Sequence, residues 1–443
     1  MDFARHDSPK VQAQLDRLAV LSLPQGRIGL DAIRALLGRV GNPQLGLPPV
    51  FHVAGTNGKG SVCAFLLAIM QAEGLRVHAT ISPHLVRYNE RIRIAGHLID
   101  DEHLAALLKE VLDAADDLPV SFFETTIAAS FLAFAREPAD ACIIEVGLGG
   151  RFDATNVIES PAACGIATLG IDHERFLLAP EDGTPTEPLA RIAFEKAGIA
   201  KPGAPLVTQA YPPSAELEIK RAAHACGALL HMRGEHWDAG TVGPIEYRDR
   251  QGAMTLPMPV LPGAHQADNA ALAVAMLRHQ SVVSVSRDAM AAGIRVMRWP
   301  ARLQRLGDGP LLALAGAREV WLDGGHNPDA GAALARYFTA DHQTGSDPVS
   351  TPAGGVHLII GMLDNKNPRA LTDPLGARIA SLSAVPIVGH PHHPTSAFGS
   401  DAVGFSDVPS ALDALPDDGL PVLIAGSLYL AGEVLRLNGE FPD

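Results

Sequence analysis

The sequence predicts an α/β protein in which a P-loop-containing doubly wound domain is followed by a smaller, Rossmann-like α/β domain. Two observations support this prediction. Short apolar runs alternate with helical patterns along most of the 443 residues, as in parallel sheets covered by helices. In addition, the apolar run 51–54 passes through a glycine-rich turn into the helix-forming stretch 62–70, which is the order of strand, phosphate loop and helix.

The composition argues against several classes of protein. The net charge of −14 disfavours a nucleic-acid partner, which favours a basic surface. No apolar run approaches the roughly 20 residues that span a bilayer, and residues 1–7 lack the apolar core of a signal peptide. Cys63, Cys142, Cys164 and Cys226 form no C-x-x-C pair. Three of them lie in apolar surroundings, so we expect buried, inert thiols. We therefore expect a cytoplasmic protein that binds neither nucleic acid nor membrane.

Residues 55–61 predict a phosphate-binding loop, which follows helical segments within residues 1–49. The glycines of the loop let the backbone approach an anion, and the helix start presents N–H groups and the positive end of its dipole. Lys59 can reach terminal phosphates, and the Ser61 hydroxyl can bind magnesium. The spacing is tighter than the usual G-x-x-x-x-G-K-[ST], so a tight turn with an exposed lysine is the alternative. The expected nucleotide contacts are Gly55, Thr56, Asn57, Gly58, Lys59, Gly60 and Ser61.

Polar residues stand at the ends of three further strands of the predicted sheet, at Ser82, Glu145 and His173. Ligands of α/β sheets bind beyond the carboxyl ends of strands, and a buried carboxylate is costly unless it is paired or bound to metal. Glu145 therefore predicts a magnesium site for ATP, with Ser82 and His173 as candidate ligands. The alternatives are a turn serine, a Glu145–Arg151 ion pair and a surface histidine.

Three other residues each have two interpretations. Phe123, at the start of a strongly apolar helix, belongs either to the core or to a pocket for a flat ring. Lys196 lies in an apolar helical stretch. Burial lowers the pKa of an amine, and a neutral amine can take up carbon dioxide as a carbamate. From composition alone, however, a lysine that snorkels to solvent is the favoured interpretation. Asn269 either hydrogen-bonds a base or faces solvent from its helix.

The longer connections carry further expectations. The glycine-rich loop 147–156 contains one cation, Arg151, and one anion, Asp153, and is expected to shape a substrate pocket. Residues 177–188, rich in proline, threonine and acid, are expected to form a surface insertion. Short strands and turns are expected over residues 205–260.

The second domain follows a change in the pattern near Pro300. Proline stiffens the chain, so residues 298–303 are expected to form a hinge. Strand and helix patterns then alternate again, interrupted by a Gly/Ser/Thr/Pro loop at 341–355. The expected domains are 1–297 and 304–443.

Together these motifs resemble the folylpolyglutamate synthase/dihydrofolate synthase family, close relatives of the Mur ligases. The matching residues extend from 51 to 430, nearly the whole chain. The stretches that carry the resemblance are 55–61, 82–92, 145–156, 172–173, 195–199, 265–269, 323–328 and 426–430.

The resemblance implies an ATP-dependent amide ligase, with an ATPase domain at 1–297 and a glutamate-ligase-type domain at 304–443. The carboxylate of dihydropteroate or of a reduced folate attacks the γ-phosphate of ATP and gives an acyl phosphate. The amine of L-glutamate then displaces phosphate. The implied small-molecule partners are ATP, L-glutamate and dihydropteroate or tetrahydrofolates, with two Mg²⁺ ions, and the resemblance also allows a monovalent cation. We expect both folate activities in a monomer.

The resemblance also implies roles for individual residues. The implied magnesium ligands are Ser61, Ser82, Glu145 and His173. The implied ATP contacts beyond the loop are Asn269, Arg302 and Asp323. The implied catalytic residues are Lys196, as a carbamate, with Asp323 and His326. The implied substrate residues are Phe123, Arg151 and Asp153 for the pterin-bearing substrate and Ser427 for glutamate.

The chain departs from the family pattern at several points. The segment between His173 and Lys196 is longer and proline-rich, Ala301 replaces a usual glycine, and a glycine within 323–326 replaces a usual alanine. None of these changes removes a reacting group.

Three rival functions remain. A Mur-type ligase that adds an amino acid to a cell-wall precursor shares the chemistry, but we expect it to need a further domain before the loop. A guanine-reading switch requires N-K-x-D, and the nearest stretch, 365–368, lacks the aspartate. A small-molecule kinase would use ATP without glutamate.

Overall fold

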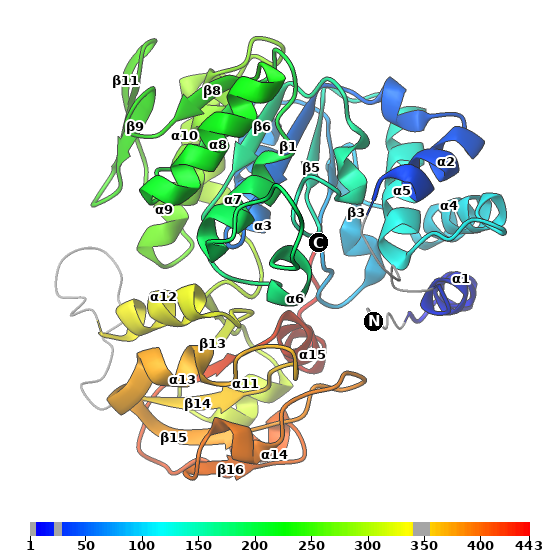
Figure 1. Cartoon of the computed structure of the whole chain (residues 1–443). Helices are drawn as coiled ribbons and strands as arrows, with labels where there is room; N and C mark the ends of the chain where they lie inside the picture. Colours follow the sequence, from blue (N-terminus) through cyan, green and yellow to red (C-terminus); the bar gives the residue numbers. More distant parts are fainter. Residues whose placement is uncertain (1–5, 22–28, 340–354) are drawn as a thin grey trace. The chain divides into compact units, whose positions relative to one another are not determined.

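The computed structural model describes residues 6–21, 29–339 and 355–443. The chain divides into two compact units, which Figure 1 draws in sequence colours. The first unit comprises Met1–Val260, Ala264–Arg298 and Asp443, and the second comprises Leu261–Gly263 and Trp299–Pro442. Except for Gly355, the loop expected over 341–355 lies outside the described residues.

The first unit is built on an eight-stranded sheet with the order β4-β3-β2-β5-β1-β6-β7-β8. From β2 to β8 all neighbours in this order are parallel, whereas β3 and β4 are antiparallel. Every residue of β1, β2, β5 and β6 is buried, which explains their apolar runs. The strands are β1 (Val50–Ala54), β2 (Val77–Thr80), β3 (Ile92–Ile94), β4 (His97–Leu98), β5 (Ala141–Glu145), β6 (Ala163–Ile166), β7 (Pro205–Thr208) and β8 (Leu229–Met232).

Helices cover this sheet (Figure 1). Side chains of α1, α2, α4 and α5 share one core with β5, and those of α7 and α8 share another with β6 and β7. The helix α5 begins with a capping box in which Ser121 and Glu124 bind each other's backbone N–H groups. The α-helices are α1 (Pro9–Ala19), α2 (Asp31–Arg39), α3 (Lys59–Ala72), α4 (Asp101–Ala114), α5 (Phe122–Arg136), α6 (Glu174–Leu177), α7 (Pro188–Ala197), α8 (Pro213–Cys226), α9 (Ala264–Arg278) and α10 (Arg287–Val296). The 3-10 helices are η1 (Pro43–Gly46), η2 (Tyr88–Arg91) and η3 (Ala154–Val157).

The expectation of short strands and turns throughout 205–260 is wrong, because the helix α8 lies within this range. Its boundaries carry ordinary signals: Pro213 occupies the first turn, and Gly227 follows the last residue with a left-handed φ of 74°. The rest of the range matches the expectation. It contains β7, β8 and a three-stranded antiparallel sheet of β9 (Trp237–Gly240), β10 (Ile245–Asp249) and β11 (Gly252–Leu256).

The second unit is a smaller α/β sandwich around a six-stranded sheet with the order β12-β13-β17-β14-β15-β16. All neighbours are parallel except β12 and β13. The predicted fold class, a P-loop domain with a Rossmann-like partner, is therefore confirmed. The strands are β12 (Gln304–Arg305), β13 (Val320–Asp323), β14 (Val356–Ile360), β15 (Ile379–Ala384), β16 (Ala402–Gly404) and β17 (Val422–Ala425). The helices are α11 (Pro310–Ala315), α12 (Pro328–Thr339), α13 (Arg369–Leu375), η4 (Gly376–Arg378), η5 (Thr395–Phe398), α14 (Val408–Asp413) and α15 (Leu428–Asn438).

Two expectations from composition can be compared with the fold. Cys63, Cys142 and Cys164 are buried and Cys226 is half-buried, all as free thiols. Burial raises the pKa of the Cys164 thiol to about 12, which makes it unreactive at neutral pH. Within the described ranges, no helix is both long and apolar enough to cross a bilayer.

Candidate active site

Four neighbouring parallel strands of the first unit deliver the predicted site residues to one edge of the sheet. In the order β2-β5-β1-β6, Ser82 follows β2, Glu145 ends β5, the loop 55–61 follows β1, and His173 lies beyond β6. The register confirms the alignment, because Val53 pairs with both Glu145 and Gly165. These residues therefore share the edge at which α/β sheets bind ligands.

The loop 55–61 has the backbone expected of a phosphate loop. Gly58 has a left-handed φ of 84° immediately before α3, so Lys59 is the first helical residue. The backbone N–H groups of Thr56 and Asn57 both donate to the carbonyl of Thr168, at 2.8 and 3.2 Å. The Thr56 hydroxyl donates to the carbonyl of Gly170 at 2.8 Å. The segment that follows β6 thus holds the loop in shape, a contact for which the sequence offers no local signal.

Asn269 lies against the loop instead of facing solvent. Its side chain is buried, and its Nδ2 donates to Oε1 of Gln266 at 3.2 Å. A Cβ built on Gly58 would stand 2.4 Å from Oδ1 of Asn269, so any other residue at position 58 would collide with this amide. The alternative of a solvent-facing amide is therefore wrong, and α9 contributes a polar group at the loop.

Glu145 and Ser82 are in direct contact. Glu145 is only 5% exposed, and its Oε2 accepts a hydrogen bond from the Ser82 backbone N–H at 3.0 Å. The alternative partner, Arg151, instead forms ion pairs with Glu181 and Glu195. Glu145 is therefore a buried carboxylate held by a backbone donor at the phosphate-loop edge.

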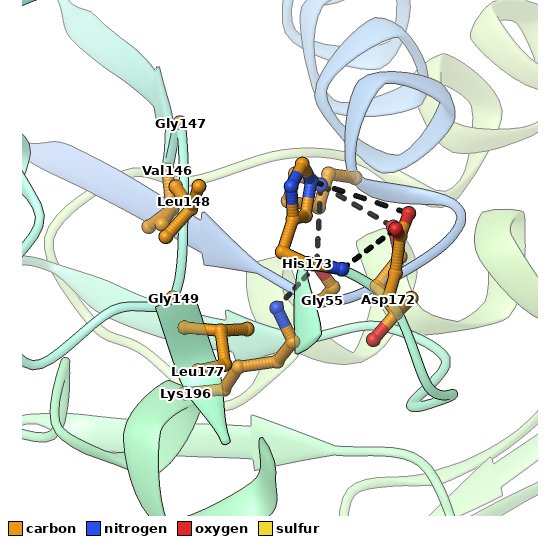
Figure 2. Close-up of a pocket in the computed structure, with 11 residues that line it drawn as sticks. Gly55, Val146, Gly147, Leu148, Gly149, Asp172, His173, Leu177 and Lys196 are labelled. Atoms are coloured by element: carbon orange, nitrogen blue, oxygen red, sulfur yellow. Dashed lines mark hydrogen bonds and ion pairs between the residues drawn. The ribbon is translucent and has the colours of Figure 1, made fainter. Parts of the chain in front are cut away.

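A pocket opens beside the loop and contains about 250 Å³ of empty space, part of it open solvent. Figure 2 shows Lys196 and His173 on its wall, with the backbone of Gly147–Gly149 opposite. His173 is well exposed, has a left-handed φ of 54° and caps the short helix α6. The residues that line the pocket are Gly55, Thr56, Lys59, Val146, Gly147, Leu148, Gly149, Asp172, His173, Leu177 and Lys196.

Lys196 is buried at the base of this pocket. The residue is 4% exposed, and its Nζ donates to the carbonyl of Gly55 at 2.9 Å (Figure 2). Burial, helped by the nearby charge of Lys59, lowers the pKa of Lys196 from 10.5 to about 7. The interpretation as a snorkelling lysine is wrong, because Nζ points into the protein. A neutral amine beside a phosphate loop is thus available near neutral pH.

Two predicted substrate residues pack around the glycine-rich loop. The ring of Phe123 lies against Gly147, where an added Cβ would come within 2.3 Å of the ring. Asp153 is buried, and its oxygens accept hydrogen bonds from Thr155 and from the Leu148 backbone N–H. Burial raises the pKa of Asp153 despite these donors. Asp153 therefore shapes the loop from inside.

Arg151 belongs to an ion cluster with Glu181, Arg191 and Glu195. These three partners of Arg151 were not predicted from the sequence. Arg191 and Glu195 stand one turn apart on α7, a spacing that can indicate an ion pair. Glu181 lies in the segment expected to be a surface insertion, and no local sequence pattern indicates its pairing with Arg151.

The second unit holds the remaining predicted residues. Asp323, at the end of β13, accepts hydrogen bonds from the backbone N–H groups of Leu303 at 2.8 Å and Gly325 at 2.7 Å. Nη1 of Arg302 donates to the carbonyl of Ala301 at 3.0 Å, and Nδ1 of His326 lies 2.9 Å from the carbonyl of Gly324. These three side chains therefore gather around the end of β13.

Ser427 follows the neighbouring strand β17. It is buried and caps α15, because its hydroxyl accepts a hydrogen bond from the Tyr429 backbone N–H at 3.1 Å. The register places Asp323 opposite Ala425, so both predicted residues stand at the carboxyl ends of paired strands. The strand end at Asp323 was predicted from the sequence, whereas Ser427 lies beyond the end of its strand and not within it.

The donor set at the sheet edge fits a hard cation. Ser61 and Ser82 supply hydroxyl oxygens and Glu145 supplies a carboxylate, the ligand type that Mg²⁺ prefers. In the part of the chain that the structure describes, no three His, Cys, Asp or Glu side chains gather as a metal cluster.

Comparisons with known proteins agree with the resemblance that the motifs indicate. No family model matches the chain. The dihydrofolate synthase/folylpolyglutamate synthase of Escherichia coli K12 is 32% identical over 419 residues, which cover 93% of this chain and 91% of that protein. The chain belongs to the dihydrofolate synthase/folylpolyglutamate synthase family. The resemblance inferred from the motifs is therefore confirmed.

Solved structures of this family extend the match to three dimensions. The structure of E. coli FolC in complex with DHPP and ADP has a TM-score of 0.82 and 29% identity, and covers 97% of this chain and 98% of that one. A bifunctional folylpolyglutamate synthase/dihydrofolate synthase with Mn, AMPPNP and L-glutamate bound has a TM-score of 0.81 and 29% identity, over 98% of this chain and 99% of that one. This family membership does not favour the Mur-type alternative.

Proposed function

We propose that this chain is an ATP-dependent ligase that joins L-glutamate to dihydropteroate and to reduced folates through an acyl phosphate. The observation that carries the proposal is the position of Lys196, whose buried Nζ lies 2.9 Å from the carbonyl oxygen of Gly55 at the start of the phosphate loop. Family membership supports the choice of substrates, because relatives in the family are named for these two activities.

The loop 55–61 would bind the phosphates of ATP. Its glycines and the start of α3 offer a close backbone approach and the positive end of the helix dipole. Nζ of Lys59 donates hydrogen bonds to the carbonyls of Gly55 and Thr56. From this position Lys59 would neutralise charge on the transferred phosphoryl group. The substrate carboxylate attacks the γ-phosphorus and ADP leaves. The glutamate amine then attacks the acyl carbon, loses a proton and expels phosphate.

Two magnesium ions complete this proposal. Ser61, Ser82, Glu145 and His173 would hold them, and the ions would supply positive charge at the phosphates. Glu145 is held ready by the Ser82 backbone N–H, and His173 shares a pocket with Lys196. A monovalent cation is proposed on the family resemblance alone.

Lys196 is proposed to act as a carbamate. A pKa near 7 leaves about half of the amine neutral at neutral pH, and neutral Nζ can attack carbon dioxide and lose a proton. The product would place two oxygens in the pocket beside His173, where they could help hold the second ion.

The remaining assignments follow the same family. Phe123 and Asp153 are proposed at the pterin-bearing substrate, Ser427 at glutamate, and Asn269 at ATP. Of these, Asn269 is supported by its contact with Gly58 and Phe123 by its contact with Gly147. The family resemblance assigns Arg151 to the pterin-bearing substrate as well, although its guanidinium already contacts two carboxylates.

The second-unit assignments rest on the resemblance and on their shared position. Arg302 and Asp323 are proposed as ATP contacts, and Asp323 and His326 as catalytic residues of the smaller domain, 304–443. Residues 1–297 would form the ATP-binding domain and 298–303 the hinge. A monomer in the cytoplasm is proposed, and size-exclusion chromatography with light scattering tests the oligomeric state.

The deciding experiment measures phosphate release from ATP. The purified chain is given dihydropteroate or tetrahydrofolate, each with and without L-glutamate. We expect release that requires both co-substrates, together with a product heavier by one glutamate residue by mass spectrometry. Release that does not depend on glutamate would support a kinase instead and overturn the proposal.

A further inference from the structure

Four charged side chains next to the pocket form a closed cluster, which we name the Arg–Glu cluster: Arg151, Glu181, Arg191 and Glu195. Nη2 of Arg151 lies 2.5 Å from Oε2 of Glu181 and 2.8 Å from Oε1 of Glu195. Nη2 of Arg191 lies 3.1 and 2.9 Å from the same two carboxylate oxygens. Each arginine therefore bridges both glutamates, and the charges of the cluster sum to zero.

The cluster is sequestered from solvent. The side chains of Arg191 and Glu195 are 6% and 8% exposed, and those of Arg151 and Glu181 about a fifth. The Arg151 guanidinium also lies over the rings of Phe152 and Phe194, at 4.1 and 4.9 Å. Removing one partner from such a group leaves an uncompensated buried charge, so the remaining side chains must rearrange.

The cluster joins three walls of the pocket. Arg151 belongs to the glycine-rich loop after β5, Glu181 to the segment that continues from His173 and α6, and Glu195 directly precedes Lys196 on α7. The loop and the helix also interlock through their backbones, because the Arg151 N–H donates to the carbonyl of Glu195 at 2.8 Å.

Close packing leaves these walls little freedom to shift independently. A Cβ on Gly150 would stand 2.7 Å from the carbonyl oxygen of Glu195, and one on Gly198 would stand 2.4 Å from Cβ of Arg151. Gly150 and Gly198 thus let the loop and the end of α7 touch backbone to backbone. A change in the Arg–Glu cluster would be transmitted directly to the position of Lys196.

We propose that Arg151 is a positioning residue and that the Arg–Glu cluster fixes Lys196 and the glycine-rich loop relative to the segment of His173. This inference deepens the proposed function and rests on it. It replaces the assignment of Arg151 to the substrate, because both edges of its guanidinium are taken by Glu181 and Glu195. It also gives the segment 177–188 a structural role, because Glu181 ties that segment to Arg151 and Arg191 beside the pocket.

If Arg151 instead binds the substrate, removing the charge of Glu181 should have a different kinetic effect. If Arg151 bound the anionic part of the pterin-bearing substrate, Glu181 would compete with that substrate for the guanidinium. Removing the charge of Glu181 would then lower the substrate KM. If Glu181 positions the pocket, removing its charge lowers kcat and leaves that KM nearly unchanged.

The test is the substitution Glu181→Gln, measured by glutamate-dependent phosphate release. We expect kcat to fall about tenfold, because small displacements of a catalytic group are costly, with the KM of tetrahydrofolate within about twofold of wild type. The matched control is Glu110→Gln, which breaks the bidentate pair with Arg136 on the surface of α4 and α5 and should leave both constants unchanged. An unchanged kcat or a lowered KM in Glu181→Gln would overturn the proposal.

Two further variants distinguish a positioning role of the cluster from a loss of activity caused by misfolding. Glu181→Asp keeps the charge, and we expect it to recover most of the kcat if the cluster positions the pocket. Arg151→Lys combined with Glu181→Gln should be no slower than the slower single variant, because both act through one cluster. Additive losses, or a raised tetrahydrofolate KM in Arg151→Lys alone, would instead assign Arg151 to the substrate.

Measurements on the wild-type protein distinguish failure of the proposed function from failure of the positioning role. If wild type releases phosphate without glutamate, the proposed function fails, and the positioning role fails with it. If wild type requires glutamate and Glu181→Gln behaves like wild type, only the positioning role fails. Unfolding in urea for every variant identifies losses that come from instability.

Discussion

The two sheets of this protein place acidic and hydroxyl side chains at equivalent positions but use them differently. In the first unit, Glu145 ends β5 and lies beside a pocket that contains Lys196 with a pKa lowered to about 7. In the second unit, Asp323 ends β13, and both its carboxylate oxygens accept backbone N–H groups, while Ser427 caps a helix. In the second unit, the strand-end side chains already accept backbone N–H groups, whereas in the first unit the strand-end carboxylate lies at the edge that also carries a buried amine.

The comparison shows what distinguishes a reactive edge. A strand-end carboxylate can be stabilised wholly by the backbone that it organises, so its position alone does not identify chemistry. The first unit adds a second, independent sign, which is a buried amine that burial has shifted towards its neutral form. The following predictions test whether this difference between the two edges is real.

The largest effect is expected from Lys196→Ala. The substitution removes the amine at the base of the pocket, and we expect kcat for glutamate-dependent phosphate release to fall by more than about a hundredfold. Short carboxylates such as acetate, added at high concentration, should restore part of the activity if they replace carbamate oxygens.

The control for this variant is Lys220→Ala on α8, whose ammonium is exposed and paired with Glu216 and Glu235. It should retain full activity. Wild-type rates in Lys196→Ala would end the carbamate hypothesis and remove the main distinction between the two edges.

Glu145→Gln and Asp323→Asn compare the two carboxylates directly. We expect Glu145→Gln to raise the magnesium concentration needed for half-maximal activity and to lower kcat roughly tenfold to a hundredfold. Asp323→Asn weakens the hydrogen bonds to Leu303 and Gly325, so it should cost about 1–3 kcal/mol of unfolding free energy without changing the magnesium requirement. Magnesium titrations and urea unfolding measure these effects, and equal magnesium requirements would contradict the comparison.

Gly58→Ala tests the shape of the phosphate loop, with Gly74→Ala as its match. Both glycines have nearly the same positive φ, 84° and 86°, so both variants should lose about 1 kcal/mol from backbone strain. Only Gly58 has a neighbour within 4 Å of the added Cβ, namely Asn269. Gly58→Ala should therefore lose about 1 kcal/mol more and show a raised KM for ATP, and equal behaviour of the two variants would count against the contact.

The smallest effect is a pH dependence of stability. Between pH 7 and 10.5 the unfolded chain keeps a proton on Lys196 that the folded chain has lost, so this residue makes stability rise with pH. Below pH 7 both states hold the proton, and the contribution is constant and least favourable.

The unfolding free energy of wild type minus that of Lys196→Met should thus rise across this window, by up to about 1.4 kcal/mol per pH unit. Urea unfolding in buffers free of carbon dioxide measures it, and Lys220→Met should show no such slope. A flat difference for Lys196→Met would mean that its amine titrates normally.

Much of the fold was readable from short stretches of sequence. The fully buried strands β1, β2, β5 and β6 appear as apolar runs, and the loop 55–61 appears as a glycine pattern before a helix. The helix α8 was missed, although a proline and a glycine mark its ends, because its amphipathic pattern stands in a region dominated by turns.

The candidate site was only partly readable. Ser82 and Glu145 were placed correctly at strand ends, and the carboxyl ends of parallel strands meet at one edge. The strand expected to reach residue 171 ends at Ile166, so His173 instead lies at the start of α6. The sequence left open whether Lys196 snorkels, whether Asn269 faces solvent and whether Glu145 pairs with Arg151. Each of these alternatives depends on which distant segment packs against the side chain.

By itself, therefore, the sequence determined the P-loop, most of the succession of strands and helices and the family, since each of these signals comes from residues that lie within a few positions of each other. Only the tertiary structure decided that Lys196 donates a hydrogen bond to the carbonyl of Gly55, 141 residues earlier. It also decided that Arg151 pairs with the carboxylate of Glu195, 44 residues later. The physical reason is that burial, and with it the pKa of a lysine or the choice of an ion-pair partner, is a property of packed neighbours and not of chain neighbours.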